Sequence, residues 1–135
     1  MRQQEIKIKA DIEKYIDYII VVEGKKDVNA LSSLGFKRVY ALHQTSVPIK
    51  ERIVLIASNL DKKDKICILT DLDKKGKSLY LLAKSIFIEL GVKLDSNFRD
   101  SLLRSGISHI EGLYHYLKQT NQILFKFLIT KTNTR

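Results

Sequence analysis

The sequence has few features that could cross-link the chain or anchor it to a membrane. Its 135 residues include one cysteine, Cys67, so no disulfide can form within the chain, and we expect a reducing compartment, the cytoplasm. No apolar run approaches the length that crosses a bilayer, and residues 1–5 do not begin a signal peptide, so we expect no membrane partner. No internal repeat, low-complexity segment or linker divides the chain. This length predicts one domain with its own core.

Acidic residues are in deficit. The chain has 24 lysines and arginines against 15 aspartates and glutamates, which gives a formal net charge of +9. A small domain this basic attracts polyanions, and nucleic acid is the first candidate. Lysine-rich surfaces also occur in proteins without such a partner, notably those of thermophiles. The charge therefore indicates a class of partner and does not locate a site.

Apolar runs alternate with amphipathic helical patterns along the chain. The predicted strands are 18–23, 36–42, 65–70 and a short 92–94, and the predicted helices are 5–16, 25–34, 49–60, 74–90, 97–103 and one from 108 onward. Unbroken apolar runs are typical of strands that helices cover on both faces. The alternation predicts an α/β fold with three layers (α/β/α, Rossmann-like) and a mostly parallel four-stranded sheet. Residues 108–111 have the form of a capping box that opens the last helix.

Carboxylates directly follow two of these strands. Glu23 ends the first apolar run, and Asp71 and Asp73 follow the third. Parallel strands end at one edge of the sheet, where ligands bind, and acids two residues apart can lie on one side of a strand. Oxygen ligands of this kind suit Mg²⁺. Acids after strands are also common helix N-caps, so each segment alone has two interpretations, and the two segments together favour a metal site.

Lysines surround the same strand ends. Lys25 and Lys26 come just after Glu23, while Lys74, Lys75 and Lys77 come just after Asp73. These positions lie near the N-terminal, positive ends of helix dipoles, where backbone amides and ammonium groups can hold phosphate. Carboxylates at the centre would then hold a Mg²⁺ ion that bridges to the phosphate. This pattern fits a phosphodiester better than a neutral metabolite.

The two segments, Val21–Asp27 and Ile68–Gly76, resemble the signatures of the Toprim domain. Topoisomerases, bacterial-type primases, overcoming-lysogenization-type nucleases, recombination mediators and a ribonuclease that matures a small ribosomal RNA share this domain. The resemblance spans about residues 17–95, and the chain is similar to small standalone archaeal Toprim proteins. We accordingly expect an N-terminal helix at 1–16, a Toprim core at 17–95, a helical extension at 96–129 and a loose tail at 130–135. Residues 122–135 could form a helix end or an added strand.

The resemblance also implies roles for individual residues. Glu23 would be the general acid/base or a carboxylate that organises the metal, and Asp71 and Asp73 would be ligands of Mg²⁺ or Mn²⁺. Gly24 and Gly76 would be turn residues that let the backbone approach the site. The residues expected to contact phosphate through side chain or backbone are Gly24, Lys25, Lys26, Lys74 and Gly76.

Other reactive side chains have simpler explanations. Tyr40 lies in a predicted core strand and Tyr80 follows an inward leucine, so we expect neither to be a nucleophile. His43 follows a strand and is the histidine best placed for a site contact, although a role in the loop is the alternative. His109 and His115 belong to the distal helix and are expected to be structural or exposed.

These observations predict an enzyme, a metal-dependent phosphodiester hydrolase that acts as a nuclease or RNA-maturation factor on RNA or DNA. The chain lacks the tyrosine-bearing cleavage domain of a topoisomerase and the zinc-binding and helicase-docking regions of a primase, so neither complete enzyme is expected. Two alternatives stay open. One is a non-catalytic nucleic-acid-binding adaptor, and the other is a subunit of a larger primase- or recombination-type assembly, with a protein partner or a homodimer.

Overall fold

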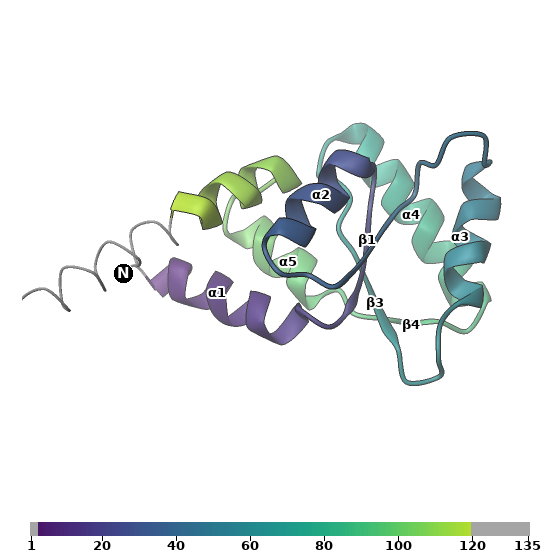
Figure 1. Ribbon diagram of the computed structural model, residues 1–135, viewed down its shortest axis with the longest axis horizontal. Coiled ribbons are helices and arrows are strands. Elements are labelled where there is room, and N and C mark those ends of the chain that lie inside the picture. The colour runs from purple at the N-terminus through teal and green to yellow at the C-terminus, as the bar shows by residue number, and fades with distance from the viewer. Residues whose placement is uncertain (1–2, 120–135) are drawn as a thin grey trace, which may run out of the picture.

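The computed structural model of the chain describes residues 3–119, with side chains from residue 7 (Figure 1). Residues 120–135, which include the predicted end of the extension and the tail, lie outside the described residues. The elements in chain order are α1 (Gln3–Tyr15), β1 (Ile19–Val22), α2 (Lys25–Ser33), β2 (Arg38–Ala41), α3 (Ile49–Ser58), β3 (Lys65–Ile68), α4 (Lys74–Glu89), β4 (Lys93–Leu94), α5 (Asn97–Arg104) and a further helix over 110–119. Within the described part of the chain, every helix is too short or too polar to cross a membrane.

The four strands form one sheet in the order β2-β1-β3-β4, and every pairing is parallel. This confirms the predicted α/β fold. The paired strands are shorter than the predicted apolar runs. Hydrogen bonding nevertheless continues past the strand ends, since Leu42 N donates to Val22 O at 2.8 Å and Leu69 N donates to Val21 O at 2.7 Å. The ends of β1, β2 and β3 are therefore held side by side.

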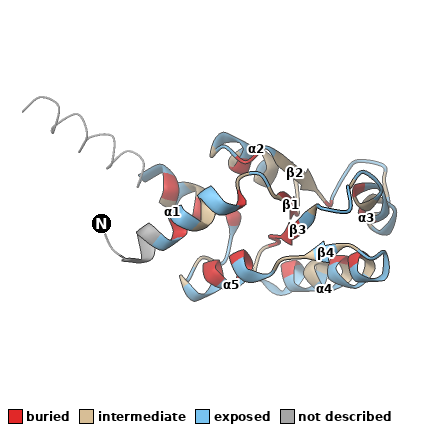
Figure 2. Ribbon diagram, turned by 90° about the horizontal axis from the view of Figure 1, so that it is seen from below, coloured by how far each residue is buried: buried red, intermediate tan, exposed pale blue. Residues whose placement is uncertain are grey.

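The sheet lies between two layers of helices, each with its own core. Ile20 and Val22 face a cluster that includes buried residues of α1, α2, α5 and the helix 110–119, whereas Ile19 and Val21 face a cluster built with α3 and α4. Side chains alternate between the faces of a strand, so one apolar run supplies both cores. Figure 2 shows the buried positions on the central strands and on the inward faces of the helices. Each fully buried aliphatic side chain contributes about 1.5–3 kcal/mol of hydrophobic stabilisation.

Glycines end two of the helices as the sequence predicts. Gly35 after α2 has φ +103 and Gly91 after α4 has φ +76, both in the left-handed region that side chains with a Cβ rarely adopt. Pro48 precedes α3, which also agrees with its expected place near a helix start. These residues determine where the chain leaves each helix and returns to the sheet.

The start of the helix 110–119 differs from the predicted capping box. The Asp71 carboxylate, from the loop between β3 and α4, accepts the Ile110 amide at 3.1 Å through its Oδ1. Ser108 Oγ instead lies 2.8 Å from Nδ1 of the neighbouring His109 ring. A tertiary contact thus occupies the end of this helix, where a negative charge is favourable.

Candidate metal centre

Glu23 links the ends of the two central strands. Its Oε1 accepts the backbone amide of Asp71 at 2.9 Å. Desolvation by burial raises the pKa of Glu23, the hydrogen bond from Asp71 opposes this effect, and the negative charges of Asp71 and Asp73 raise the pKa further. A carboxylate with a raised pKa, close to other acids at a strand end, suits proton transfer better than an ordinary surface glutamate does.

Asp71 and Asp73 each use one oxygen to hold backbone. Asp73 Oδ1 accepts the Gly76 amide at 2.7 Å and so caps α4, while Asp71 Oδ1 holds Ile110. The helix-cap interpretation is therefore correct for Asp73. A carboxylate has a second oxygen with its own lone pairs. Capping therefore orients these side chains and leaves Oδ2 of each for another ligand.

Gly76 is required by the close approach of two strand-end segments. A Cβ on this buried residue would overlap the Asp71 carbonyl and would lie 2.7 Å from Glu23 Oε1. Gly24 differs, because its backbone is extended (φ −143, ψ 179) and a Cβ there would meet nothing within 4 Å. Both glycines were expected to let the backbone approach the site. Gly76 lets the Asp71 carbonyl and the Glu23 carboxylate approach its backbone, whereas the space beside Gly24 is empty.

Arg99 of α5 fixes the end of β3. Its guanidinium, 8% exposed, donates to Thr70 O at 2.7 Å and lies 4.2 Å from the centre of the Tyr80 ring. Thr70 Oγ1 in turn donates to Gly76 O at 2.7 Å. Desolvation lowers the pKa of Arg99. Sequence patterns gave no signal for this residue, which sits in a predicted helix like any surface arginine, and the contact explains why Tyr80 is a packing residue.

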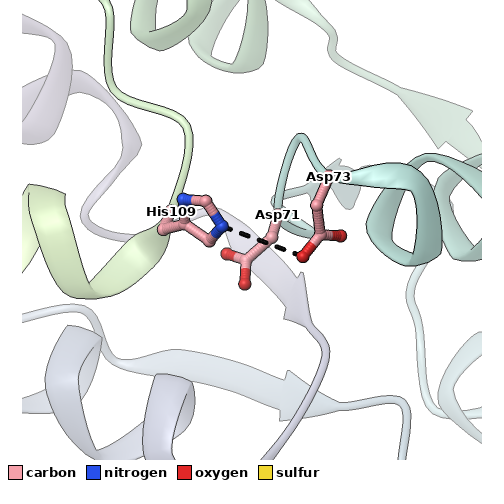
Figure 3. A group of neighbouring side chains, drawn as sticks. All are labelled: Asp71, Asp73 and His109. Atoms are coloured by element: carbon pink, nitrogen blue, oxygen red, sulfur yellow. Dashed lines mark ion pairs between the residues drawn. The ribbon is translucent and has the colours of Figure 1, made fainter.

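His109 lies beside the two aspartates. Its Nε2 is 3.8 Å from Asp73 Oδ2, and one donor atom each of Asp71, Asp73 and His109 lie within 4.8 Å of one another (Figure 3). His109 is exposed, as expected. The sequence did not predict that it lies next to the two aspartates. Sequence periodicity placed it at the start of a distal helix and could not show which loop that helix meets.

The remaining histidines and Tyr40 are less closely connected with the site. The His43 backbone amide donates to Glu23 O at 2.9 Å, so this residue adjoins the site through its backbone while its side chain is exposed. His115 Nε2 is 3.7 Å from Glu111 Oε1, one turn along the last helix. Tyr40 packs against the core beneath α3 and α4, which agrees with its expected role.

A cleft of about 340 Å³ opens next to the aspartates, between α2 and the last helix. Its lining residues are Lys26, Asp27, Ala30, Asp71, His109, Glu111, Tyr114 and His115. The lysines expected to contact phosphate are exposed: Lys25 and Lys26 begin α2, and Lys74 and Lys75 begin α4. Cationic side chains and helix N-termini thus flank the acids on two sides.

The donor set fits a divalent cation. Asp71 and Asp73 each offer a hard oxygen donor, and His109 offers a nitrogen donor within the same group. Glu23 is not a member of this group of donor atoms, and its Oε1 is engaged by the Asp71 amide. Its role as a direct ligand therefore stays a prediction, and its surroundings favour the acid/base role that was the other expectation.

The fold and these strand-end acids define a known class of domain. The Toprim domain family matches residues 17–96, and the chain belongs to this family. Toprim domains bind Mg²⁺ generally, and membership indicates a metal-binding role in nucleic-acid processing.

The relatives make this assignment more specific. A UPF0292 protein of Methanocaldococcus jannaschii is 33% identical over 124 residues, which cover 86% of this chain and 87% of the relative. A UPF0292 protein of Pyrococcus abyssi is 38% identical over 109 residues, 76% of each chain. A solved structure from Aquifex aeolicus is similar with a TM-score of 0.67 and 32% identity, covering 82% of this chain and 98% of that one. The likeness to small archaeal Toprim proteins is confirmed.

Proposed function

We propose that this protein is a Mg²⁺- or Mn²⁺-dependent enzyme that hydrolyses phosphodiester bonds in nucleic acid, as a nuclease or RNA-maturation factor. The observation that carries the proposal is the meeting of Glu23 with Asp71 and Asp73 at one edge of the sheet, where Glu23 Oε1 accepts the Asp71 amide at 2.9 Å. The acids come from strands that are distant in sequence and adjacent in the fold. We expect the enzyme to act in the cytoplasm, where nucleic acid and Mg²⁺ occur together.

Each side chain has a distinct part in this reaction. Asp71 and Asp73 would hold the cation, which when bound polarises the phosphoryl oxygen and neutralises developing charge. Glu23 takes or delivers the proton at its carboxylate, and its burial and the neighbouring aspartates raise the pKa of this carboxyl above its ordinary value. Lys25 and Lys26 bind the phosphate backbone and direct it toward the acids.

The distribution of charge supports a polyanionic substrate. Acids alone at this edge would repel phosphate, but exposed lysines begin both helices that flank them, and the sequence carries a net charge of +9. An electropositive rim draws nucleic acid in, and a cation at the centre then offsets the local negative charge.

The direct test is incubation with labelled single- and double-stranded RNA and DNA, each with and without Mg²⁺ or Mn²⁺. The matched control is the double variant Asp71→Asn/Asp73→Asn, because asparagine retains the hydrogen bonds to Ile110 and Gly76 and is an equally good N-cap. We expect metal-dependent cleavage of at least one substrate by the native protein and none by the double variant. Tight binding without cleavage of any substrate would instead favour the adaptor.

A further inference from the structure

The segment that joins α5 to the last helix is fastened to the loop between β3 and α4. Leu72 N donates to Ser108 O at 2.8 Å, and Ile110 N donates to Asp71 Oδ1 at 3.1 Å. These bonds hold the backbone on both sides of His109. The His109 side chain is therefore brought to the aspartates by the fold, although its ring is exposed.

The orientation of the His109 ring is also set. Nδ1 lies 2.8 Å from Ser108 Oγ, and Nε2 is directed toward the aspartates (Figure 3). In a neutral imidazole whose Nδ1–H donates to Ser108 Oγ, the lone pair is on Nε2. Metal-binding histidines in proteins have this arrangement, in which a hydrogen bond at one ring nitrogen fixes the tautomer that ligates through the other.

The spacing of the three side chains is close to that of ligands around one ion. Ligand atoms about 2.1 Å from a cation can lie up to about 4.2 Å apart when they are opposite one another. The donor atoms of Asp71, Asp73 and His109 all lie within 4.8 Å of one another. A small rotation of the exposed Asp73 and His109 side chains closes this difference, so movement of the backbone or of the half-buried Asp71 is unnecessary.

We propose that His109 is a third protein ligand of the divalent ion, and that its nitrogen shifts the preference of the site from Mg²⁺ toward Mn²⁺ and Co²⁺. Mg²⁺ favours oxygen ligands, whereas imidazole suits transition-metal ions. His109 lies beyond residues 17–96, the part that matches the Toprim family, so the following part of this chain adds to the site. The inference rests on the proposed function, because it assumes that Asp71 and Asp73 hold the ion.

The experiment measures ion binding and needs no substrate. Co²⁺ is titrated into the full chain, followed by its visible absorption and by calorimetry, and Mg²⁺ affinity is measured in the same way. The variants are His109→Ala, Asp71→Asn/Asp73→Asn, and His115→Ala as the matched control. His115 lines the same cleft from the helix that follows His109 but lies outside the group of donor atoms.

We expect His109→Ala to lower Co²⁺ affinity at least about tenfold, more than it lowers Mg²⁺ affinity, and to change the Co²⁺ spectrum. His115→Ala should leave both unchanged. If His109→Ala keeps the native Co²⁺ affinity and spectrum while the aspartate variant loses binding, the inference about His109 is wrong and the proposed site stands. If the native protein binds neither ion, or the aspartate variant binds both normally, the proposed site and the inference both fail.

A second variant tests the inference even if His109→Ala does not fold. Circular dichroism without metal shows whether His109→Ala is folded, and Ser108→Ala removes only the partner of Nδ1. We expect Ser108→Ala to weaken Co²⁺ binding about tenfold and to leave Mg²⁺ binding close to native, since such supporting bonds are typically worth 10- to 100-fold in metal affinity, by order of magnitude. Equal Co²⁺ affinity in Ser108→Ala and the native protein, with His109→Ala unfolded, would overturn the inference.

Discussion

Acidic residues have different partners at the two edges of the sheet, where the strands begin and where they end. At the edge where the strands begin, acids are paired with bases: Arg38 donates to Asp64 at 2.9 and 3.1 Å, and Lys37 Nζ lies 3.3 Å from Asp17. At the edge where they end, Glu23, Asp27, Asp71 and Asp73 lie near one another. Among the side chains described, from residue 7 to 119, none of these four forms an ion pair with lysine or arginine.

The pKa values follow this difference. Arg38 lowers the pKa of Asp64, whereas desolvation and neighbouring acids raise the pKa of Glu23 and of Asp27. Lysine and arginine neutralise acids at the first edge, whereas within the described residues the acids at the second edge have no such partner. Clustered acids of this kind are typical of sites where a bound cation supplies positive charge, which supports the proposed location of the metal site at the strand ends.

The largest expected effect separates catalysis from binding at the acidic edge. Glu23→Gln can still accept the Asp71 amide, so the loop should keep its place, but glutamine cannot transfer a proton. We expect turnover on the cleaved substrate to fall by about 100- to 10,000-fold, with nucleic-acid affinity unchanged or slightly higher. Single-turnover cleavage and filter binding measure the two quantities. Native turnover in this variant would remove Glu23 from the mechanism.

Alanine substitutions of the two glycines at this edge should have different effects on stability, because one glycine is closely packed and the other is not. Gly76→Ala should destabilise the protein by about 1–3 kcal/mol, because the added methyl overlaps the Asp71 carbonyl. Helix propensity alone would make alanine at this position of α4 more stable by about 1 kcal/mol, so a loss of stability would show that the methyl group collides with the backbone. Gly24→Ala should change stability by less than about 0.5 kcal/mol. Urea unfolding measures both, and equal stabilities of the two variants would contradict the described approach.

The lysines at the two edges should contribute differently to nucleic-acid binding. Replacing Lys25 and Lys26 with alanine should reduce the slope of log affinity against log salt by about two, one for each lost phosphate contact. The matched control is Lys62→Ala/Lys63→Ala, which removes the same charge from the exposed turn before β3. Equal slopes for the two double variants would show that nucleic acid does not dock at the strand ends.

The smallest effect is a difference in the pH dependence of stability, measured by urea unfolding between pH 3 and 7 with a chelator present. Because the pKa of Asp64 is lower in the folded state, its ionisation stabilises the fold at pH values above the unfolded-state pKa of about 3.9. This stabilisation is lost as pH falls through the folded-state pKa. Asp64→Asn should therefore be less stable than native protein near pH 7, with a gap that narrows in acid.

Asp27→Asn should show the opposite sign. Because burial raises the pKa of Asp27, ionisation destabilises the native state as pH rises through the folded value. The asparagine variant should be more stable than native protein near pH 7, and the two should converge at low pH. The same sign for Asp27→Asn and Asp64→Asn would mean that the two edges do not differ electrostatically.

The sequence by itself determined the sheet and most of the acidic edge. The apolar runs ending at Val22 and Leu69 form buried strand segments with alternating faces, and acids after parallel strands must share an edge. Gly35 and Gly91 end helices where their backbone freedom is needed. These features depend on local periodicity and on residues next to each strand, which a sequence displays directly.

Only the tertiary structure decided which side chains from other segments reach this edge. Arg99 holds Thr70, and His109 lies beside Asp73, because α5 and the last helix pack on the same face of the sheet as α1 and α2. Helical periodicity specifies which face of a helix is buried but not which distant loop its first residue meets. Asp71 likewise caps a helix that begins at residue 110, where the local pattern indicated Ser108. Such pairings are set by packing between elements, so no local pattern encodes them.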